Sequence, residues 1–194
     1  MKKRLVLFLV LVLSMTMVGC SSGASDNVTD SSQMTKEITE EEKEDVISEF
    51  LVDFFGLNCD GRYDTFMKEV EGIDYLANAE VSEEGIAELP KEFQDAYDNY
   101  FDELSKYATE DCIRTMKANR LPIQLDMFAK EKEIKDSIDY IELDYSEGDE
   151  NVYSYAVHFE AYEGETYFTE PLRGQVSVEI VDGEVKISSI SIVQ

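Results

Sequence analysis

The feature that most constrains the fold is a long stretch of alternating apolar and polar residues between Ile138 and Val193. An alternation with a period of two places successive side chains on opposite faces, which is typical of a half-buried β-strand. Turn signals divide this stretch into four segments, whereas the chain between Thr39 and Glu133 shows helical spacing. The sequence therefore predicts an α+β fold in which N-terminal helices pack on one face of a curved, four-stranded antiparallel meander.

Each of the four predicted strands has an apolar face. The strands are separated by a polar loop at 146–151, a tight turn at 163–164 and a hairpin turn at Asp182-Gly183. The last of these suits a type I′ turn, because both central residues of that turn need a positive φ. The apolar positions are, in chain order, Ile138, Tyr140, Ile141, Leu143 and Tyr145; Tyr153, Tyr155, Val157, Phe159 and Ala161; Leu172, Gly174, Val176, Val178 and Ile180; and Val185, Ile187, Ile190 and Ile192.

The predicted sheet is strongly curved rather than flat. The alternation slips between Tyr140 and Ile141 and again at 188–189, as a β-bulge would make it do. Pro171 cannot donate a hydrogen bond to a neighbouring strand, so it marks an edge or a bend. Long strands with two bulges and a bend predict a sheet that coils on itself.

The first nineteen residues have the pattern of an export signal. Residues 2–4 are basic, and the apolar run 5–13 is too short to span a bilayer. Residues 17–20, with the sequence Met-Val-Gly-Cys, then resemble the lipobox of bacterial lipoproteins. That resemblance implies that the sulfur of Cys20 receives a diacylglyceryl group and that the chain is cleaved just before it. The alternative is an ordinary secretory signal followed by an unrelated cysteine.

Residues 20–36 are predicted to form the lipidated cysteine and a flexible tether, and residues 37–194 a single folded domain. The tether is rich in Ser, Gly, Asp and Thr and cannot bury enough apolar surface to fold. Its mean reach is roughly 20–25 Å. Acyl chains on Cys20 would give a stable anchor. We therefore expect the domain on the extracytoplasmic side of the cell membrane, attached to the membrane through Cys20.

The chain is strongly acidic, with 17 Lys and Arg against 43 Asp and Glu and a net charge of −26. Removal of residues 1–19 takes away three basic residues and no acidic one, which leaves a charge of −29. Such a field repels nucleic acid, so neither DNA nor RNA is expected as a partner. It favours a cationic partner, such as a basic protein or peptide surface, although it could serve only to keep an exported protein soluble.

After lipidation of Cys20, two cysteines remain. Outside the cytoplasm Cys59 and Cys112 are candidates for a disulfide bond, which would stabilise the fold by on the order of 4 kcal/mol in the chain-entropy model. Two buried free thiols are the alternative, and both interpretations stay open. Because His158 is the single histidine and no Cys-x-x-Cys motif occurs, no metal site and no other cofactor are predicted.

The helical half opens with the strongest helix signal of the chain. Thr39 and Glu42 fit a capping box, and Gly56 suits the position just after a helix. Apolar residues at helical spacing lie between them: Val46, Ile47, Phe50, Leu51, Phe54 and Phe55. Further helices are predicted around Phe66, over 93–107 and from Thr109, the last with an interruption at 121–122. Residues 73–89 are expected to be helical over a short range at most.

Helices followed by a four-strand meander resemble the nuclear-transport-factor-2-like (cystatin-like) fold, in which the sheet forms a cone. The hairpin sequence Val-Asp-Gly-Glu-Val-Lys-Ile, the helix end Phe-Phe-Gly and the segment Asp-Gly-Arg-Tyr-Asp resemble members found in exported lipoproteins of Gram-positive bacteria. The resemblance covers 39–193, and the extra helical sequence between 73 and 133 departs from the usual member. Since this fold hosts both enzymes and binding modules, it implies no single activity.

The apolar faces of the predicted strands offer phenols but no acid or base. An isomerase-like or dehydratase-like enzyme, or a small-molecule binder, would use the cavity of the cone, and the enzyme would need a carboxylate or imidazole there. His158 is predicted on the opposite face, although Asp64 from a helix could reach the cavity. No catalytic residue is therefore predicted. The leading hypothesis is a non-catalytic, membrane-anchored binding or scaffold module for a protein or peptide partner with a basic or apolar surface. A homodimer through the mixed sheet face is a further option.

Overall fold

The computed structural model describes residues 38–57, 61–74, 80–81, 87–146, 148–161, 164 and 166–193. These residues belong to the unit Thr35–Gln194. They contain five helices and six strands: α1 (Glu40–Phe54), α2 (Arg62–Glu69), β1 (Glu80–Val81), β2 (Ala87–Glu88), α3 (Lys91–Ser105), α4 (Glu110–Asn119), α5 (Ile123–Glu131), β3 (Ser137–Ser146), β4 (Asp149–Glu160), β5 (Leu172–Val181) and β6 (Glu184–Val193).

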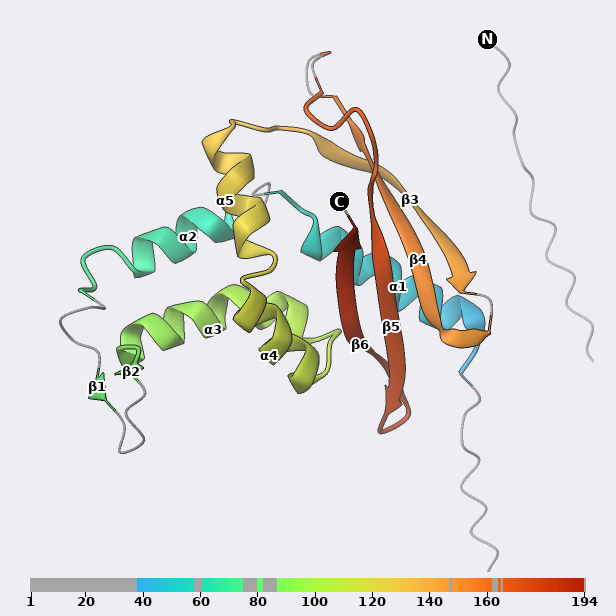
Figure 1. Ribbon diagram of the computed structural model, residues 1–194, viewed down its shortest axis with the longest axis horizontal. Helices are drawn as coiled ribbons and strands as arrows, with labels where there is room; N and C mark the ends of the chain where they lie inside the picture. Colours follow the sequence, from blue (N-terminus) through green and yellow to red (C-terminus); the bar gives the residue numbers. More distant parts are fainter. Residues whose placement is uncertain are drawn as a thin grey trace, which may run out of the picture. The chain divides into compact units, whose positions relative to one another are not determined.

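The main sheet has four antiparallel strands in the order β3-β4-β5-β6, so that each strand pairs with its neighbour in sequence and the sheet does not close (Figure 1). The predicted α+β class and the antiparallel meander are confirmed. The hairpin between β5 and β6 turns at Asp182 and Gly183, with φ values of 53° and 83°. Both residues thus have the positive φ that the sequence predicted for this turn.

A bulge in β3 differs in position from the prediction. The register shifts between Ile138 and Tyr140, one step earlier than the alternation indicated, so that Asp139 is the extra residue. Ile138 and Ile141 then both face the helices, whereas Tyr140 lies on the other face opposite His158. The placement of Tyr140 on the apolar face was therefore wrong. The second slip is confirmed, because Ser177 pairs with Ser189 while Val178 pairs with Ile187.

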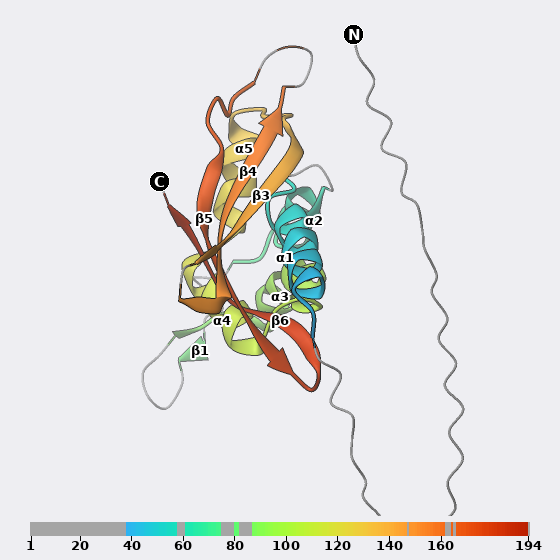
Figure 2. The ribbon, with the colours of Figure 1, turned by 90° about the vertical axis from the view of Figure 1, so that its right-hand side faces the viewer.

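The helices cover the inner face of the sheet. Figure 1 shows α2, α3, α4 and α5 to one side of the strands and α1 crossing behind them, and Figure 2 gives the view at right angles. Helix α1 begins at the predicted capping box, in which the Glu42 amide donates to Thr39 Oγ1 and Glu42 Oε2 accepts from the Thr39 amide. The fully buried core joins the two layers, with Ile47, Phe50, Leu51, Phe54, Phe55, Phe101, Leu104 and Met116 from the helical side and Tyr153, Val157, Val176 and Ile187 from the sheet.

The segment 73–89 is not helical where it is described. It contains the two short strands β1 and β2, which pair with each other through Glu80–Glu88 and Val81–Ala87. Helix α3 starts directly after Pro90, α4 is capped by Thr109, and the predicted interruption at 121–122 separates α4 from α5. The predicted helix start at Thr109 and the predicted interruption at 121–122 are thus confirmed.

A buried ion pair connects four helices. Asp126 of α5 has no exposed surface, and its Oδ2 accepts from Nε of Arg62 at 2.6 Å while Oδ1 accepts from Nη2 at 3.2 Å. The Tyr100 hydroxyl of α3 also donates to this carboxylate. The same guanidinium donates to the carbonyls of Asp53 and Phe54 at the end of α1. One arginine at the start of α2 thus satisfies orphan carbonyls of α1 and neutralises a carboxylate of α5.

A second internal tie crosses the sheet. Tyr155 of β4 lies opposite Gly174 of β5, and its hydroxyl donates to the carbonyl of Ser191 in β6 at 2.9 Å. A Cβ at Gly174 would lie 1.9 Å from that carbonyl oxygen and 2.4 Å from the phenol oxygen. Glycine is therefore required at this position, because any side chain would collide with the phenol that bridges the strands.

We predict that replacing Arg62 with Ala destabilises the domain by roughly 3–5 kcal/mol, because the substitution leaves the Asp126 carboxylate buried without its cation. Urea unfolding followed by circular dichroism measures the change. Replacing Lys130, whose Nζ makes an exposed ion pair with Asp64 at 2.9 Å, is the matched control and should cost about 0–1 kcal/mol. Equal losses for the two variants would contradict a central role for the buried pair.

Candidate functional site

The inner face of the sheet is only partly covered. Around Val176, Val178, Val185 and Ile187 its side chains are buried under the helices. Other side chains of this face are half-buried, and a group of them lies toward the end of the sheet away from the β5–β6 hairpin. We call this group the apolar patch; it consists of Ile138, Ile141, Phe159, Leu172, Ile190 and Ile192. The register places the six residues on one face of four adjacent strands, so they form a continuous apolar surface.

An aromatic row connects the apolar patch to α5. Phe159 stacks on Phe168 with ring centroids 4.7 Å apart, Phe168 contacts Tyr167 at 5.5 Å, and Tyr167 contacts Phe128 of α5 at 5.4 Å. Tyr167 is 50% exposed. A fully buried aromatic side chain would stabilise the fold more, because it would remove more apolar surface from water. The row thus continues the apolar surface from the sheet to the helical layer and leaves part of it open to solvent.

The carboxylate of Asp136, directly before β3, holds the aromatic row in place. Asp136 is 3% exposed and accepts hydrogen bonds from the Tyr167 amide at 2.8 Å, from the Phe168 amide at 3.1 Å and from Thr166 Oγ1 at 2.9 Å. Two backbone amides and a hydroxyl that converge on one oxygen of a carboxylate, here Oδ2, hold the loop 166–168 in place. Asp136 lies between the predicted helical part and the predicted strands, and the sequence did not identify it as a site residue.

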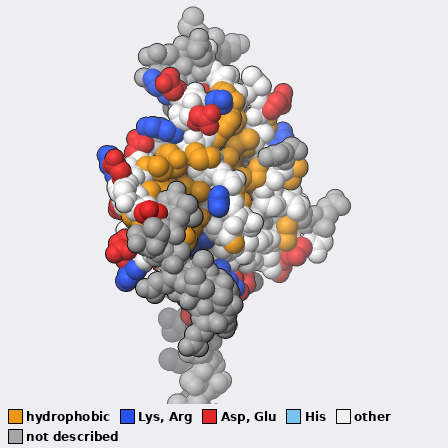
Figure 3. Space-filling view, turned by 60° about the vertical axis from the view of Figure 1, so that its left-hand side comes forward, with side chains coloured by type: hydrophobic (Ala, Val, Ile, Leu, Met, Phe, Trp, Pro, Cys, Tyr) orange, Lys and Arg blue, Asp and Glu red, His pale blue; other side chains and the backbone are white. Residues whose placement is uncertain are grey.

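Apolar side chains are also exposed on the helical layer. Figure 3 shows the side of the domain that holds α2, α3 and α5, where hydrophobic side chains gather into a band with acidic and basic side chains around it. Met67 of α2 and Met127 of α5 are 44% and 49% exposed. Contiguous apolar surface of this kind marks interaction sites more often than isolated exposed residues do.

The titratable groups on the inner face are phenols. Burial raises the pKa of Tyr155 well above its usual value, and burial together with the Glu40 carboxylate does the same for Tyr153, whose hydroxyl donates to Glu40. Neutral phenols of this kind donate hydrogen bonds and do not act as bases near neutral pH. Asp64, the helical acid that could have reached a cavity, instead pairs with Lys130 at the surface.

The outer face of the sheet carries His158, as predicted. Its ring stacks on Tyr140 with centroids 4.1 Å apart and an interplanar angle of 11°. Nε2 lies 3.4 Å from Oε2 of Glu142, within ion-pair distance, but makes no hydrogen bond to any described residue. The histidine is thus set between a phenol and a carboxylate on the face opposite the apolar patch.

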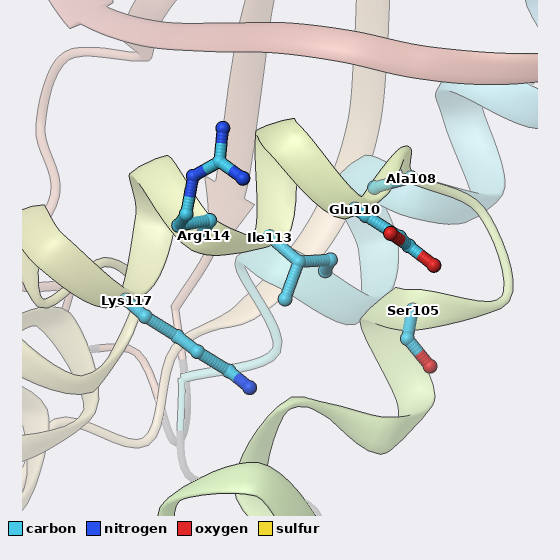
Figure 4. A pocket seen from close by; sticks show the side chains of 6 residues that line it. All are labelled: Ser105, Ala108, Glu110, Ile113, Arg114 and Lys117. Carbon is cyan, nitrogen blue, oxygen red and sulfur yellow. The ribbon is translucent and has the colours of Figure 1, made fainter.

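Described residues also line two surface hollows elsewhere on the domain. One, of about 380 Å³, is lined from the end of α3 to α4 by the side chains in Figure 4: Ser105, Ala108, Glu110, Ile113, Arg114 and Lys117. The other, of about 410 Å³, lies between the start of α1 and the β5–β6 hairpin. Their cations are already paired: Lys117 with Asp98 at 2.6 Å, and Lys106 with Asp53 at 3.2 Å. Arg114 and Lys186, which also line the hollows, pair with Asp111 at 2.8 Å and with Glu184 at 3.0 Å. Neither hollow therefore offers an unpaired cation to an anionic ligand.

The predicted cysteine sites are only partly within the described residues. Cys20 and Cys59 lie outside them, so lipidation and the disulfide stay predictions. Cys112 is buried in α4 and has no disulfide partner among the described residues. Burial raises the pKa of its thiol to about 11, so the reactive thiolate is scarce at neutral pH.

Within the described residues, no group of three or more His, Cys, Asp or Glu side chains could hold a metal ion. The described helices also include none that is long and apolar enough to cross a membrane. Comparisons of the chain with family models, with curated proteins and with solved structures gave no match.

We predict that Cys112 reacts at least about tenfold more slowly with a thiol reagent at pH 8 in the folded protein than in urea, because burial disfavours the thiolate. The measurement is the time course of thiol release with Ellman's reagent, with Cys112→Ser as the blank. Rapid labelling of the folded protein would contradict the buried position. If Cys112 is bonded to Cys59, labelling in urea will appear only after reduction.

Proposed function

We propose that the protein is a membrane-anchored extracytoplasmic lipoprotein whose domain is a non-catalytic binding or scaffold module for a protein or peptide partner. The observation that carries the proposal is the apolar patch, which remains half-buried on the inner face of the sheet and continues through the aromatic row to α5. Burying such a surface against a partner is favourable at roughly 25 cal/mol per Å². The patch extends over four strands, which suits a polypeptide. It is less suited to a small polar ligand, because no described acid or base converges on it.

The anchor in this proposal is Cys20. The basic start, the short apolar run and the Met-Val-Gly-Cys segment occur in the order of a lipoprotein signal. The polar residues 21–36 would then hold the domain within a few nanometres of the extracytoplasmic surface of the cell membrane. This arrangement would present the apolar patch to envelope proteins rather than to cytoplasmic ones.

The finer fold assignment is also a proposal. A long aromatic first helix against a twisted four-stranded meander supports a cystatin-like cone of the nuclear-transport-factor-2-like kind. The bulges at Asp139 and Ser188 support it further, because bulges bend strands and bring a sheet toward a cone. The short β1–β2 hairpin between α2 and α3 is the departure from that pattern.

The composition of the inner face supports a binding role over an isomerase-like one. Enolate chemistry in a cone needs a carboxylate or imidazole beside the substrate. The inner-face side chains between Tyr153 and Phe159, between Leu172 and Ile180 and between Val185 and Ile192 include no carboxylate or imidazole, and the buried carboxylates Asp126 and Asp136 each accept hydrogen bonds from donors of the fold. Both acids therefore stabilise the fold in this proposal.

Replacing Cys20 with Ser should release the protein into the medium or leave its signal uncleaved, because the serine hydroxyl is not the acceptor of the diacylglyceryl group. Membrane fractionation and intact mass measure the two outcomes. A Cys20→Ser protein that is processed normally and stays on the membrane would show that the anchor is elsewhere.

We expect the lipidated protein to recover a discrete envelope protein from cross-linked native membranes. Phe159→Ser, which removes an aromatic ring from the apolar patch, should abolish recovery, because interface aromatics carry much of the binding energy. Val52→Ser, on the exposed side of α1, is the matched control and should leave recovery intact. Recovery that is equal for both variants would contradict binding through the patch.

A further inference from the structure

Strand β3 forms one edge of the sheet, so one side of its backbone has no neighbouring strand among the described residues. Alternate N–H and C=O groups along such an edge point outward and can pair with another extended chain. The other edge strand, β6, is partly closed, because the Ile187 amide donates to the Tyr107 carbonyl at 2.8 Å and the Ile187 carbonyl accepts from the Thr109 amide at 2.9 Å. No comparable backbone bond joins β3 to a described residue outside β4.

The part of the chain that forms β3 and β4 is strongly one-sided in charge. Residues 136–171 include no Lys or Arg, whereas eleven of them are acidic: Asp136, Asp139, Glu142, Asp144, Glu147, Asp149, Glu150, Glu160, Glu163, Glu165 and Glu170. On β3 itself, Glu142 and Asp144 are exposed and two residues apart, so both project from the outer face. An edge with this charge pattern discourages pairing with acidic or neutral chains and favours a cationic one.

The inner face of β3 is apolar. Ile141 and Leu143 are half-buried on the inner face, and Tyr145 is 50% exposed there. A strand added beside β3 would therefore meet acids on one face and apolar side chains on the other. The alternation within β3 thus specifies an alternation in its partner, since side chains that are directly opposite on neighbouring strands contact each other.

We propose that the β3 edge binds an extended segment of a partner protein, in which Lys or Arg residues alternate with apolar residues, as a fifth strand of the sheet. The inference rests on the proposed binding function and gives it a binding mode and a partner chemistry. The cations of the segment lie opposite Glu142 and Asp144, and its apolar side chains extend the row of Ile141 and Leu143. Backbone hydrogen bonds hold the segment, and the alternation selects it.

Charge excludes two other occupants of the edge. A second copy paired through its own β3 would bring Glu142 and Asp144 of one chain near those of the other, and like charges on adjacent strands are destabilising. The tether of the same chain, residues 21–36, has Asp26 and Asp30 and ends in a single cation, Lys36. It therefore lacks the repeated cations that the edge matches.

The test uses the mature chain in detergent micelles and a fluorescent ten-residue peptide of alternating Lys and Val. Anisotropy titrations should show binding that weakens with added salt, because the attraction is between exposed charges. A peptide with the same sequence but N-methyl groups on the amides that face β3 keeps its charge and loses its donors. We expect it to bind about tenfold more weakly or worse. Equal affinity of the two peptides would mean that the site recognises only the charge of the peptide. It would overturn the proposal that the peptide adds a strand to the sheet.

Protein variants locate the site. Asp144→Lys should weaken peptide binding by about five- to tenfold, because it places a cation opposite a cation. Asp102→Lys makes the same change of charge on the exposed side of α3 and should change affinity less than twofold. Hydrogen exchange should show slower exchange of β3 amides when the peptide is bound. Equal effects of the two variants, or unchanged exchange in β3, would overturn the inference.

Three further outcomes bear on this inference and on the proposed function. If the peptide fails to bind but Phe159→Ser still abolishes recovery of an envelope partner, the edge inference is wrong and the binding function stands. If the protein forms a dimer that protects the β3 amides without peptide, a second copy occupies the edge and the inference is likewise overturned. Failure of both the peptide titration and the membrane recovery would overturn the two proposals together.

Discussion

The helical layer depends on the way in which the carboxylate of Asp126 is neutralised. A carboxylate without exposed surface is tolerated only when a cation and hydrogen-bond donors surround it, and Arg62 and Tyr100 supply both. Because Arg62 also bonds the last carbonyls of α1, the positions of α1, α2, α3 and α5 are fixed together. Phe55, directly after α1, in turn contacts the sheet, where its ring centroid lies 5.7 Å from that of Tyr155. The buried contact between Arg62 and Asp126 positions the helices, and it thereby helps to determine which part of the inner face they leave uncovered.

The strands were predictable because their period and their turns agree. Alternation marked the inner face of β4, β5 and β6, and Asp182-Gly183 has the backbone that its turn requires. Alternation could not place the bulge in β3. Because Ile138, Tyr140 and Ile141 are all apolar, a register shift before Tyr140 and one after it fit the pattern equally well. The structure resolves the choice by turning Tyr140 outward, where its ring stacks on His158.

The polar contacts that organise the domain were not predictable from local pattern. Arg62 and Asp126 are 64 residues apart, and the only local sign of their contact is an acid within the otherwise apolar run of α5. Asp136 reads as an ordinary surface acid before a strand, yet it holds the loop 166–168. Short strands such as β1 and β2, with two residues each, have too few positions to show a period. Long-range pairing of this kind has no counterpart in composition or spacing.

The bridge from Tyr155 across Gly174 to Ser191 has a mechanical consequence. It adds a side-chain cross-link to the backbone ladders of β4, β5 and β6, so these three strands should move as one stiff block. Strand β3 lies outside this cross-link and joins the sheet through its ladder with β4. The domain thus combines three strands that a side chain ties together with one edge strand that backbone pairing holds to them.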